Sequence, residues 1–195
     1  VEGLQCQVER RSGGETGVKS VRCLSGYQVW ESAKRGLWSQ DLGNHAISAL
    51  LEGPGNLDAS QIDNPHVFLI EYRDGLRGSV LMLGDSGLIS SFAYAGCHAD
   101  KVNSFEYHLG DYDCTPVFGY LGLNIEEFFL TSRPPSPLER TYLTTGILEA
   151  AMLSNNRNGE IVETPYLNIS YVPFGKPVRR PDGVLPSGAS TDSWV

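Results

Sequence analysis

An aspartate–glycine pair between two apolar runs is the feature that most constrains the fold of this chain. The first run covers residues 67–72, the second covers residues 76–83, and Asp74-Gly75 lies between them. Asp-Gly is a strong short-range signal for a β-hairpin, because a type I′ turn requires positive φ at both central residues. The sequence therefore predicts an antiparallel hairpin with a type I′ turn.

Strands and helices are segregated along the rest of the chain. Further strands are predicted at residues 18–24, 88–95, 102–109, 160–162 and 167–172. Helical spacing of apolar residues predicts helices at residues 1–8, 27–36, 39–50, 121–129 and 138–154. This order predicts the α+β class, with a mostly antiparallel, open-faced sheet and helices packed on one face.

Two local motifs predict how helices begin and end. Residues 136–139 (SPLE) have the pattern of a capping box, in which Ser136 caps the helix and Glu139 reaches back to it. Residues 13–17 (GGETG) are rich in glycine but follow a helix rather than a strand. They are therefore interpreted as a helix stop and turn, and not as a phosphate-binding loop.

Length and charge limit the domain organisation and the partners. The 195 residues fit one domain, which we expect to span residues 1–172, followed by an extended or disordered tail at 173–195. The 15 Lys and Arg against 23 Asp and Glu give a net charge of −8, which argues against nucleic acid or a membrane as partner. The opening residues lack a signal-peptide pattern and the four cysteines are scattered, which favours a cytoplasmic protein.

Chemically active side chains gather around the strand predicted at residues 102–109. Residues 98–114 include two histidines, three aspartates and a cysteine, but their spacing matches no standard zinc or calcium motif. His108 is a candidate for proton transfer if this part of the sheet lines a cleft.

Three stretches resemble the second domain of Gfo/Idh/MocA-type oxidoreductases. They are residues 2–11 (EGLQCQVERR) with 13–18 (GGETGV), residues 69–77 (LIEYRDGLR) and residues 137–150 (PLERTYLTTGILEA). The resemblance implies an N-terminal Rossmann domain that binds NAD(P), followed by an α+β domain whose open sheet shapes the substrate cleft and forms a dimer interface. It also implies substrates of the sugar, inositol or polyol type and a hydride-transfer reaction.

The resemblance also indicates what this chain lacks. Glu2 stands where the family has an acid three residues after a histidine, but that histidine, the catalytic lysine and the dinucleotide site have no counterpart here. We therefore expect no cofactor on this chain alone, and NAD(P) only in a complete enzyme.

The main hypothesis is thus a substrate-binding and dimerisation domain of an NAD(P)-dependent oxidoreductase that acts on a small polyhydroxylated substrate. Glu2 and His108 are the expected catalytic residues, and Tyr94, Tyr107 and Asp111 are the expected substrate-binding residues. The expected partner is a second copy, bound through the sheet face, or a Rossmann domain.

Two alternatives remain open. The first is a cofactor-free lyase, isomerase or cyclase that uses a cavity on the sheet, with His108 and Asp111 or Asp113 as acid and base. The second is a non-catalytic binding or scaffold protein whose exposed sheet pairs with a partner.

Overall fold

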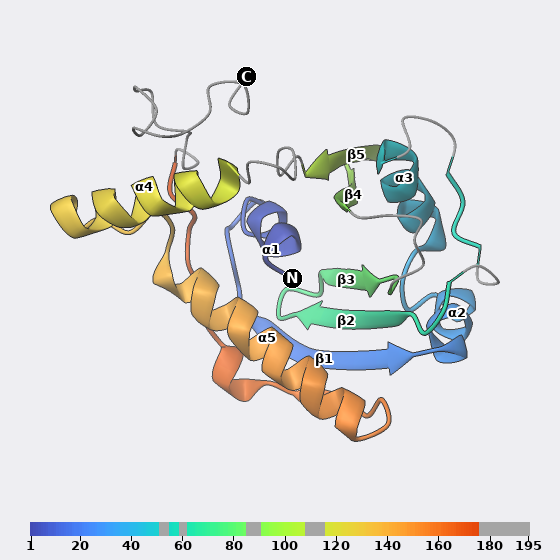
Figure 1. The fold of residues 1–195 in the computed structure, drawn as a ribbon. Coiled ribbons are helices and arrows are strands. Elements are labelled where there is room, and N and C mark those ends of the chain that lie inside the picture. Colours follow the sequence, from blue (N-terminus) through green and yellow to red (C-terminus); the bar gives the residue numbers. More distant parts are fainter. Residues whose placement is uncertain (51–54, 59–61, 85–90, 108–115, 176–195) are drawn as a thin grey trace.

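The computed structural model describes residues 1–50, 55–58, 62–84, 91–107 and 116–175. Within these residues the chain forms five helices and six strands, which confirms the α+β class (Figure 1). The helices are α1 (Glu2–Val8), α2 (Tyr27–Lys34), α3 (Gln40–Leu50), α4 (Pro116–Thr131) and α5 (Leu138–Asn156). The strands are β1 (Val18–Ser25), β2 (His66–Tyr72), β3 (Arg77–Met82), β4 (Phe92–His98), β5 (Lys101–Tyr107) and β6 (Val162–Glu163).

The hairpin predicted from Asp74-Gly75 is present, but its turn is not type I′. β2 and β3 pair in antiparallel register from His66 with Met82 to Glu71 with Arg77. The amide of Gly75 donates to the carbonyl of Tyr72 at 3.1 Å, and only Gly75 in this loop has positive φ, at 87°. These features are typical of a three-residue loop, in which a type I turn is followed by a left-handed residue.

The main sheet has the strand order β3-β2-β1-β6, with antiparallel pairing throughout. The register of β1 against β2 shifts between Val18 and Ser20, so that Lys19 is an extra residue in a β-bulge. Because of this bulge, Val18 and Val21 are three positions apart and still face the same core.

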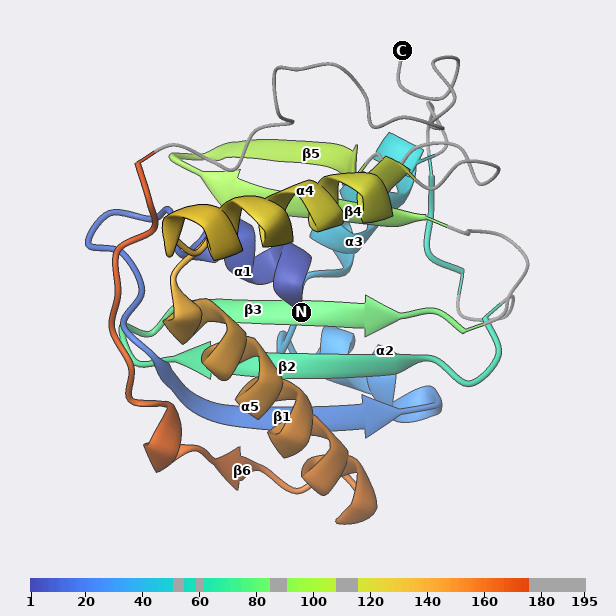
Figure 2. The same ribbon diagram turned by 60° about the vertical axis from the view of Figure 1, so that its left-hand side comes forward.

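One face of the main sheet is covered by α5 and α1. In both views α5 crosses this face (Figures 1 and 2), and its buried residues pack on Val21, Cys23, Phe68 and Ile70. The buried residues of α5 in this core are Leu143, Ile147, Ala150 and Ala151.

The other face of the main sheet has a second apolar cluster. Leu24 and Val67 are paired across β1 and β2, and they point away from Cys23 and Phe68 because neighbouring strand residues alternate between faces. Their cluster also contains Val29, Trp38, Ile47, Leu57 and Ile62, from α2, α3 and the loops around them.

β4 and β5 form a separate two-stranded sheet, which packs against α3. β4 extends beyond residue 95, the predicted end of its strand, to include Cys97 and His98. The turn consists of Ala99 and Asp100, with positive φ of 47° and 65°. Positive φ at both central residues is the type I′ pattern, so this turn occurs here and not at Asp74-Gly75.

Two predictions for the C-terminal part are wrong. The capping box at residues 136–139 does not form, because the N-cap of α5 is Pro137 and no side chain caps the helix. The strand predicted at residues 167–172 is replaced by a 3₁₀ helix, Pro165–Leu167, and a single bridge between Tyr171 and Glu15. The tail predicted at 173–195 lies outside the described residues from residue 176 onward.

Candidate functional site

Two of the five predicted site residues lie at α1, and a third is linked to them through a row of rings. Glu2 begins α1, and Tyr107 ends β5 and contacts α1 at Gly3. Tyr94 lies on β4, where its ring packs on Phe105, which packs in turn on Tyr107. His108 and Asp111 lie outside the described residues. The described part of the site is therefore a cluster of Glu2, Tyr94, Tyr107 and two neighbours, Phe105 and Arg140, which we call the α1 cluster.

Tyr107 connects the small sheet to α1. Its hydroxyl donates to the carbonyl of Gly3 at 2.7 Å. Its ring lies so close to Gly3 that a Cβ there would be 3.2 Å from the ring, which explains the glycine at this position. Burial raises the pKa of Tyr107, with a hydrogen bond to Gln7 acting in the opposite direction. The phenol is therefore protonated at neutral pH and able to donate a hydrogen bond.

The aromatic rings of the small sheet form a row. Tyr94 and Phe105 are paired across β4 and β5, and their ring centroids are 5.3 Å apart. Phe105 and Tyr107 are two positions apart on β5, so they share this face, and their centroids are 5.2 Å apart. Both tyrosines are half-buried, and burial also raises the pKa of Tyr94. The row thus offers partly exposed ring surface and two hydroxyl groups.

Charged groups complete the α1 cluster. The guanidinium of Arg140, on α5, lies 3.7 Å from the carboxylate of Glu2, which is exposed. Cys6 lies one turn further along α1, and burial raises the pKa of its thiol, with the charge of Arg140 opposing this shift. The thiol is therefore protonated at neutral pH and is a weak nucleophile.

A buried polar network holds α1 in place, and the sequence analysis did not predict it. The amide nitrogen of Gln5 donates to Glu15 at 2.6 Å and to Tyr171 at 3.0 Å, while its amide oxygen accepts from Tyr72 at 3.0 Å. The hydroxyl of Tyr171 donates to Glu9 at 2.8 Å. No buried side-chain nitrogen or oxygen in the described part of the chain lacks a hydrogen-bond partner. The network therefore fixes the position of α1 beneath the cluster.

The glycine-rich loop binds its own glutamate. The amides of Thr16 and Gly17 donate to the carboxylate of Glu15 at 2.9 and 2.7 Å, and Arg11 pairs with the same carboxylate at 3.1 Å. These amides point at an internal anion and are not available to a phosphate. The NAD(P) that the resemblance implies for a complete enzyme therefore does not fit this loop.

Comparisons with protein-family models, with curated proteins and with solved structures found no match. Within the described ranges, no group of three or more His, Cys, Asp or Glu side chains could hold a metal ion. No helix in those ranges is long and apolar enough to cross a membrane.

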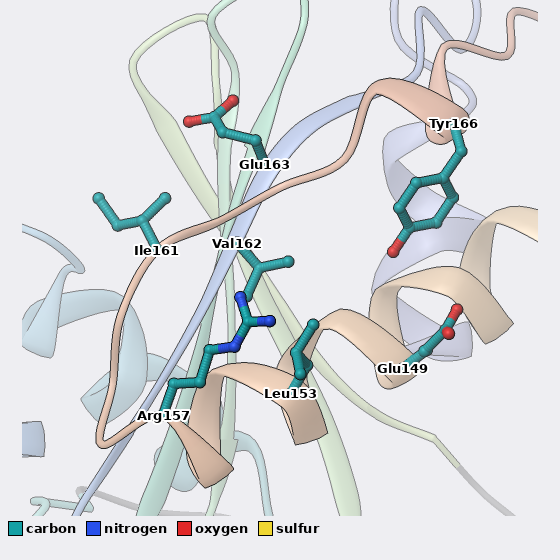
Figure 3. A pocket seen from close by; sticks show the side chains of 7 residues that line it. All are labelled: Glu149, Leu153, Arg157, Ile161, Val162, Glu163 and Tyr166. Carbon is teal, nitrogen blue, oxygen red and sulfur yellow. The ribbon is translucent and has the colours of Figure 1, made fainter.

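The α1 cluster combines the groups that recognise a polar, hydroxylated molecule. The Tyr94 hydroxyl can donate and accept, while the Tyr107 hydroxyl can only accept because its proton is donated to the Gly3 carbonyl. The Glu2 carboxylate accepts and the Arg140 guanidinium donates hydrogen bonds. Its ring surfaces can pack on C–H groups. A cavity of about 530 Å³ lies elsewhere, at the C-terminal half of α5, and none of the predicted site residues lines it (Figure 3).

Proposed function

We propose that this chain is the substrate-binding and dimerisation domain of an NAD(P)-dependent oxidoreductase that acts on a sugar-like or polyol-like substrate. By itself it does not act as a dehydrogenase. The observation that carries this proposal is the α1 cluster. In it Glu2 lies 3.7 Å from Arg140, Tyr107 binds the neighbouring Gly3, and Tyr94 extends the row of rings through Phe105.

The composition of the α1 cluster suits a small polyhydroxylated molecule. Such a molecule presents hydroxyl groups around its rim and C–H groups on its faces. The half-buried rings of Tyr94 and Tyr107 contact the C–H groups, while the carboxylate of Glu2 accepts hydrogen bonds from hydroxyls. In this proposal the chain binds and orients the substrate, and Glu2 accepts the hydroxyl proton.

The proposal assigns hydride-transfer chemistry to a second, Rossmann domain. Val1 packs beside the main core and directly precedes Glu2 in the α1 cluster. A Rossmann domain joined at Val1 would therefore be held next to the proposed substrate site. The nicotinamide of that domain supplies hydride-transfer chemistry, which this chain has no described group to supply.

Uncovered apolar surface supports a protein partner. Both faces of the main sheet are packed against other elements, whereas α4 leaves large side chains exposed: Phe118 is 67% exposed, and Phe129 and Leu130 are each 79% exposed. Contiguous apolar surface of this kind marks an interaction site. We therefore assign the dimer or domain contact to α4 rather than to the sheet face.

The same apolar surface favours a second candidate function, a non-catalytic binding protein. A non-catalytic binding protein would bind its partner through the α4 surface, and the α1 cluster would have no role in that function. The third hypothesis, a cofactor-free enzyme, depends on His108 with Asp111 or Asp113, which lie outside the described residues.

Ligand-observed NMR with a panel of sugars and inositols tests the proposal. We expect saturation transfer to at least one panel member, and an affinity several-fold weaker in Tyr107→Phe and Glu2→Gln. Tyr27→Phe is the matched control, since Tyr27 is an exposed tyrosine on α2, away from the cluster.

A parallel titration with NADH and NADPH, followed by nicotinamide fluorescence, should show no binding to this chain alone. Dinucleotide binding by the unaided chain would overturn the proposal. So would a panel in which no member binds, or binding that Tyr107→Phe and Glu2→Gln leave unchanged.

A further inference from the structure

The cavity at the C-terminal half of α5 is separate from the α1 cluster. It lies between α5 and the segment that follows it, has a volume of about 530 Å³ and is widely open to solvent (Figure 3). Its lining residues are Glu149, Leu153, Arg157, Ile161, Val162, Glu163 and Tyr166. Nothing in the proposed function uses these residues.

The apolar part of the cavity is open to solvent. Leu153 and Ile161 line it and are 37% and 59% exposed, while Val162 beside them is buried in the main core. A ligand that covers these side chains removes apolar surface from water, which favours binding.

Arg157 offers an unpaired positive charge inside the cavity. Its guanidinium makes no hydrogen bond or ion pair with another described residue, although its backbone amide is bound to Leu153 and Ser154. In Figure 3 its side chain extends from the end of α5 toward Val162, while the carboxylate of Glu163 points away from it. Arg157 is therefore available to an anionic group of a ligand.

Glu149 offers a negative charge at the other end of the cavity. Figure 3 shows the Tyr166 hydroxyl directed toward Glu149, and the pKa of Tyr166 is raised by burial and then by the charge of Glu149. Glu149 lies on α5 and Arg157 directly follows its last residue, so their Cα atoms are about 12 Å apart at 1.5 Å per residue. The two side chains form no ion pair with each other.

We propose that this cavity binds a short extended peptide of about four residues. The peptide's C-terminal carboxylate lies on Arg157, its N-terminal ammonium lies near Glu149, and an apolar side chain covers Leu153 and Ile161. An extended chain spans about 3.3 Å per residue, so about four residues match the separation of Glu149 and Arg157 along the helix. A single amino acid has both charges but is too short to reach both partners.

Calorimetric titration with the tetrapeptide Ala-Leu-Leu-Ala tests this proposal. We expect saturable binding that becomes about tenfold weaker in Arg157→Gln, because a charge-assisted hydrogen bond is lost. The C-terminal amide of the same peptide should lose a similar factor on the unmodified protein, and this measurement does not depend on the folding of a variant. The peptide acid and the peptide amide should bind Arg157→Gln with equal affinity.

Arg35→Gln is the matched control, since Arg35 is an exposed arginine that ends α2 as Arg157 ends α5. Its affinity for the tetrapeptide should equal that of the unmodified protein. Three results with the unmodified protein would overturn the proposal. They are an absence of saturable binding, equal affinities for the peptide acid and the peptide amide, and free leucine that binds as tightly as the tetrapeptide. None of these results bears on the sugar-binding test of the α1 cluster.

Discussion

Glu9 is a fully buried carboxylate that ties together three parts of the chain. It accepts two hydrogen bonds from Arg140 on α5, one of them from Nε at 2.9 Å, and a third from the hydroxyl of Tyr171. A buried charge is costly to leave unpaired, so the importance of this pair shows when one partner is removed. Arg140 also lies in the α1 cluster, and stability and the proposed binding therefore depend on one side chain.

Arg140→Met should destabilise the protein by about 3–5 kcal/mol, because it leaves Glu9 buried without its cation. Urea unfolding followed by circular dichroism measures this loss. Arg10→Met is the control: Arg10 is exposed on the same helical region and bonds only a backbone carbonyl, so its replacement should change stability by less than about 0.5 kcal/mol. Equal losses in the two variants would contradict the role given to the Glu9–Arg140 pair.

Asp74 should make stability depend on pH in the acid range. Burial alone would raise the pKa of Asp74, but hydrogen bonds from Arg11 and from the Leu76 amide lower it overall. A carboxyl whose pKa is lower in the folded state stabilises the fold above its unfolded value of about 3.9, and this stabilisation is lost as pH falls through the folded pKa. Unfolding free energy should therefore fall less steeply below about pH 4 in Asp74→Asn than in the unmodified protein. Parallel urea titrations at several pH values measure the difference, and identical slopes would contradict the prediction.

At the scale of elements, local signals predicted most of the helices and strands. The hairpin of β2 and β3 and the helix α5 were predicted because their patterns are complete within each segment. The alternation of β1 is broken by the bulge at Lys19, which depends on pairing with β2 and cannot be read from β1 alone. The prediction of a type I′ turn at Asp74-Gly75 was also wrong, and this turn type occurs at Ala99 and Asp100 instead. The turn type depends on the register that the paired strands adopt.

The candidate site was predicted only in part, because contacts between distant segments bring its residues together. Tyr94 and Tyr107 were chosen as polar groups on predicted strands. The structure brings Tyr107 to α1 and Tyr94 into the same row of rings, through pairing that sequence patterns do not specify. Gln5 and Glu9 were missed because buried polar residues look like surface residues in a sequence. Helical spacing could have indicated that they are buried. Gln5 and Glu9 lie on the same helical face as Val1 and Val8, at spacings of three and four residues.

Ala99→Gly should stabilise the β4–β5 hairpin by about 1 kcal/mol, because Ala99 has a positive φ that disfavours a side chain. Hydrogen exchange of the β4 and β5 amides measures this effect, and protection should increase. Gly75→Ala provides the opposite case in the β2–β3 hairpin, since Gly75 has positive φ and no atom within 4 Å of an added Cβ. Its only cost is backbone strain, and it should destabilise by about 1–2 kcal/mol. The two substitutions should therefore change stability in opposite directions, and changes of the same sign would contradict the prediction.

At the scale of the whole molecule, the apolar surface is distributed unevenly. α4 has a stripe of large apolar residues at helical spacing and packs closely against no other described element. The stripe consists of Phe118, Leu121, Ile125, Phe128 and Phe129. In Figure 1 this helix projects away from the sheets. A stripe of this kind normally faces a core, which is why the proposed dimer contact is assigned to α4.

Replacing Phe118 and Phe129 together with glutamate should therefore abolish self-association. Sedimentation velocity should show a concentration-dependent dimer for the unmodified protein and a 21.3 kDa monomer for the double variant. A charge buried in an apolar contact is costly, whereas the same charge on an exposed monomer helix costs little, so thermal stability of the monomer should be unchanged. Tyr27→Glu is the control, because Tyr27 is 75% exposed on α2, far from the stripe in sequence, and its replacement should leave the dimer intact. An unmodified protein that is monomeric at every concentration would contradict the homodimer and leave the α4 surface to a Rossmann domain or another protein.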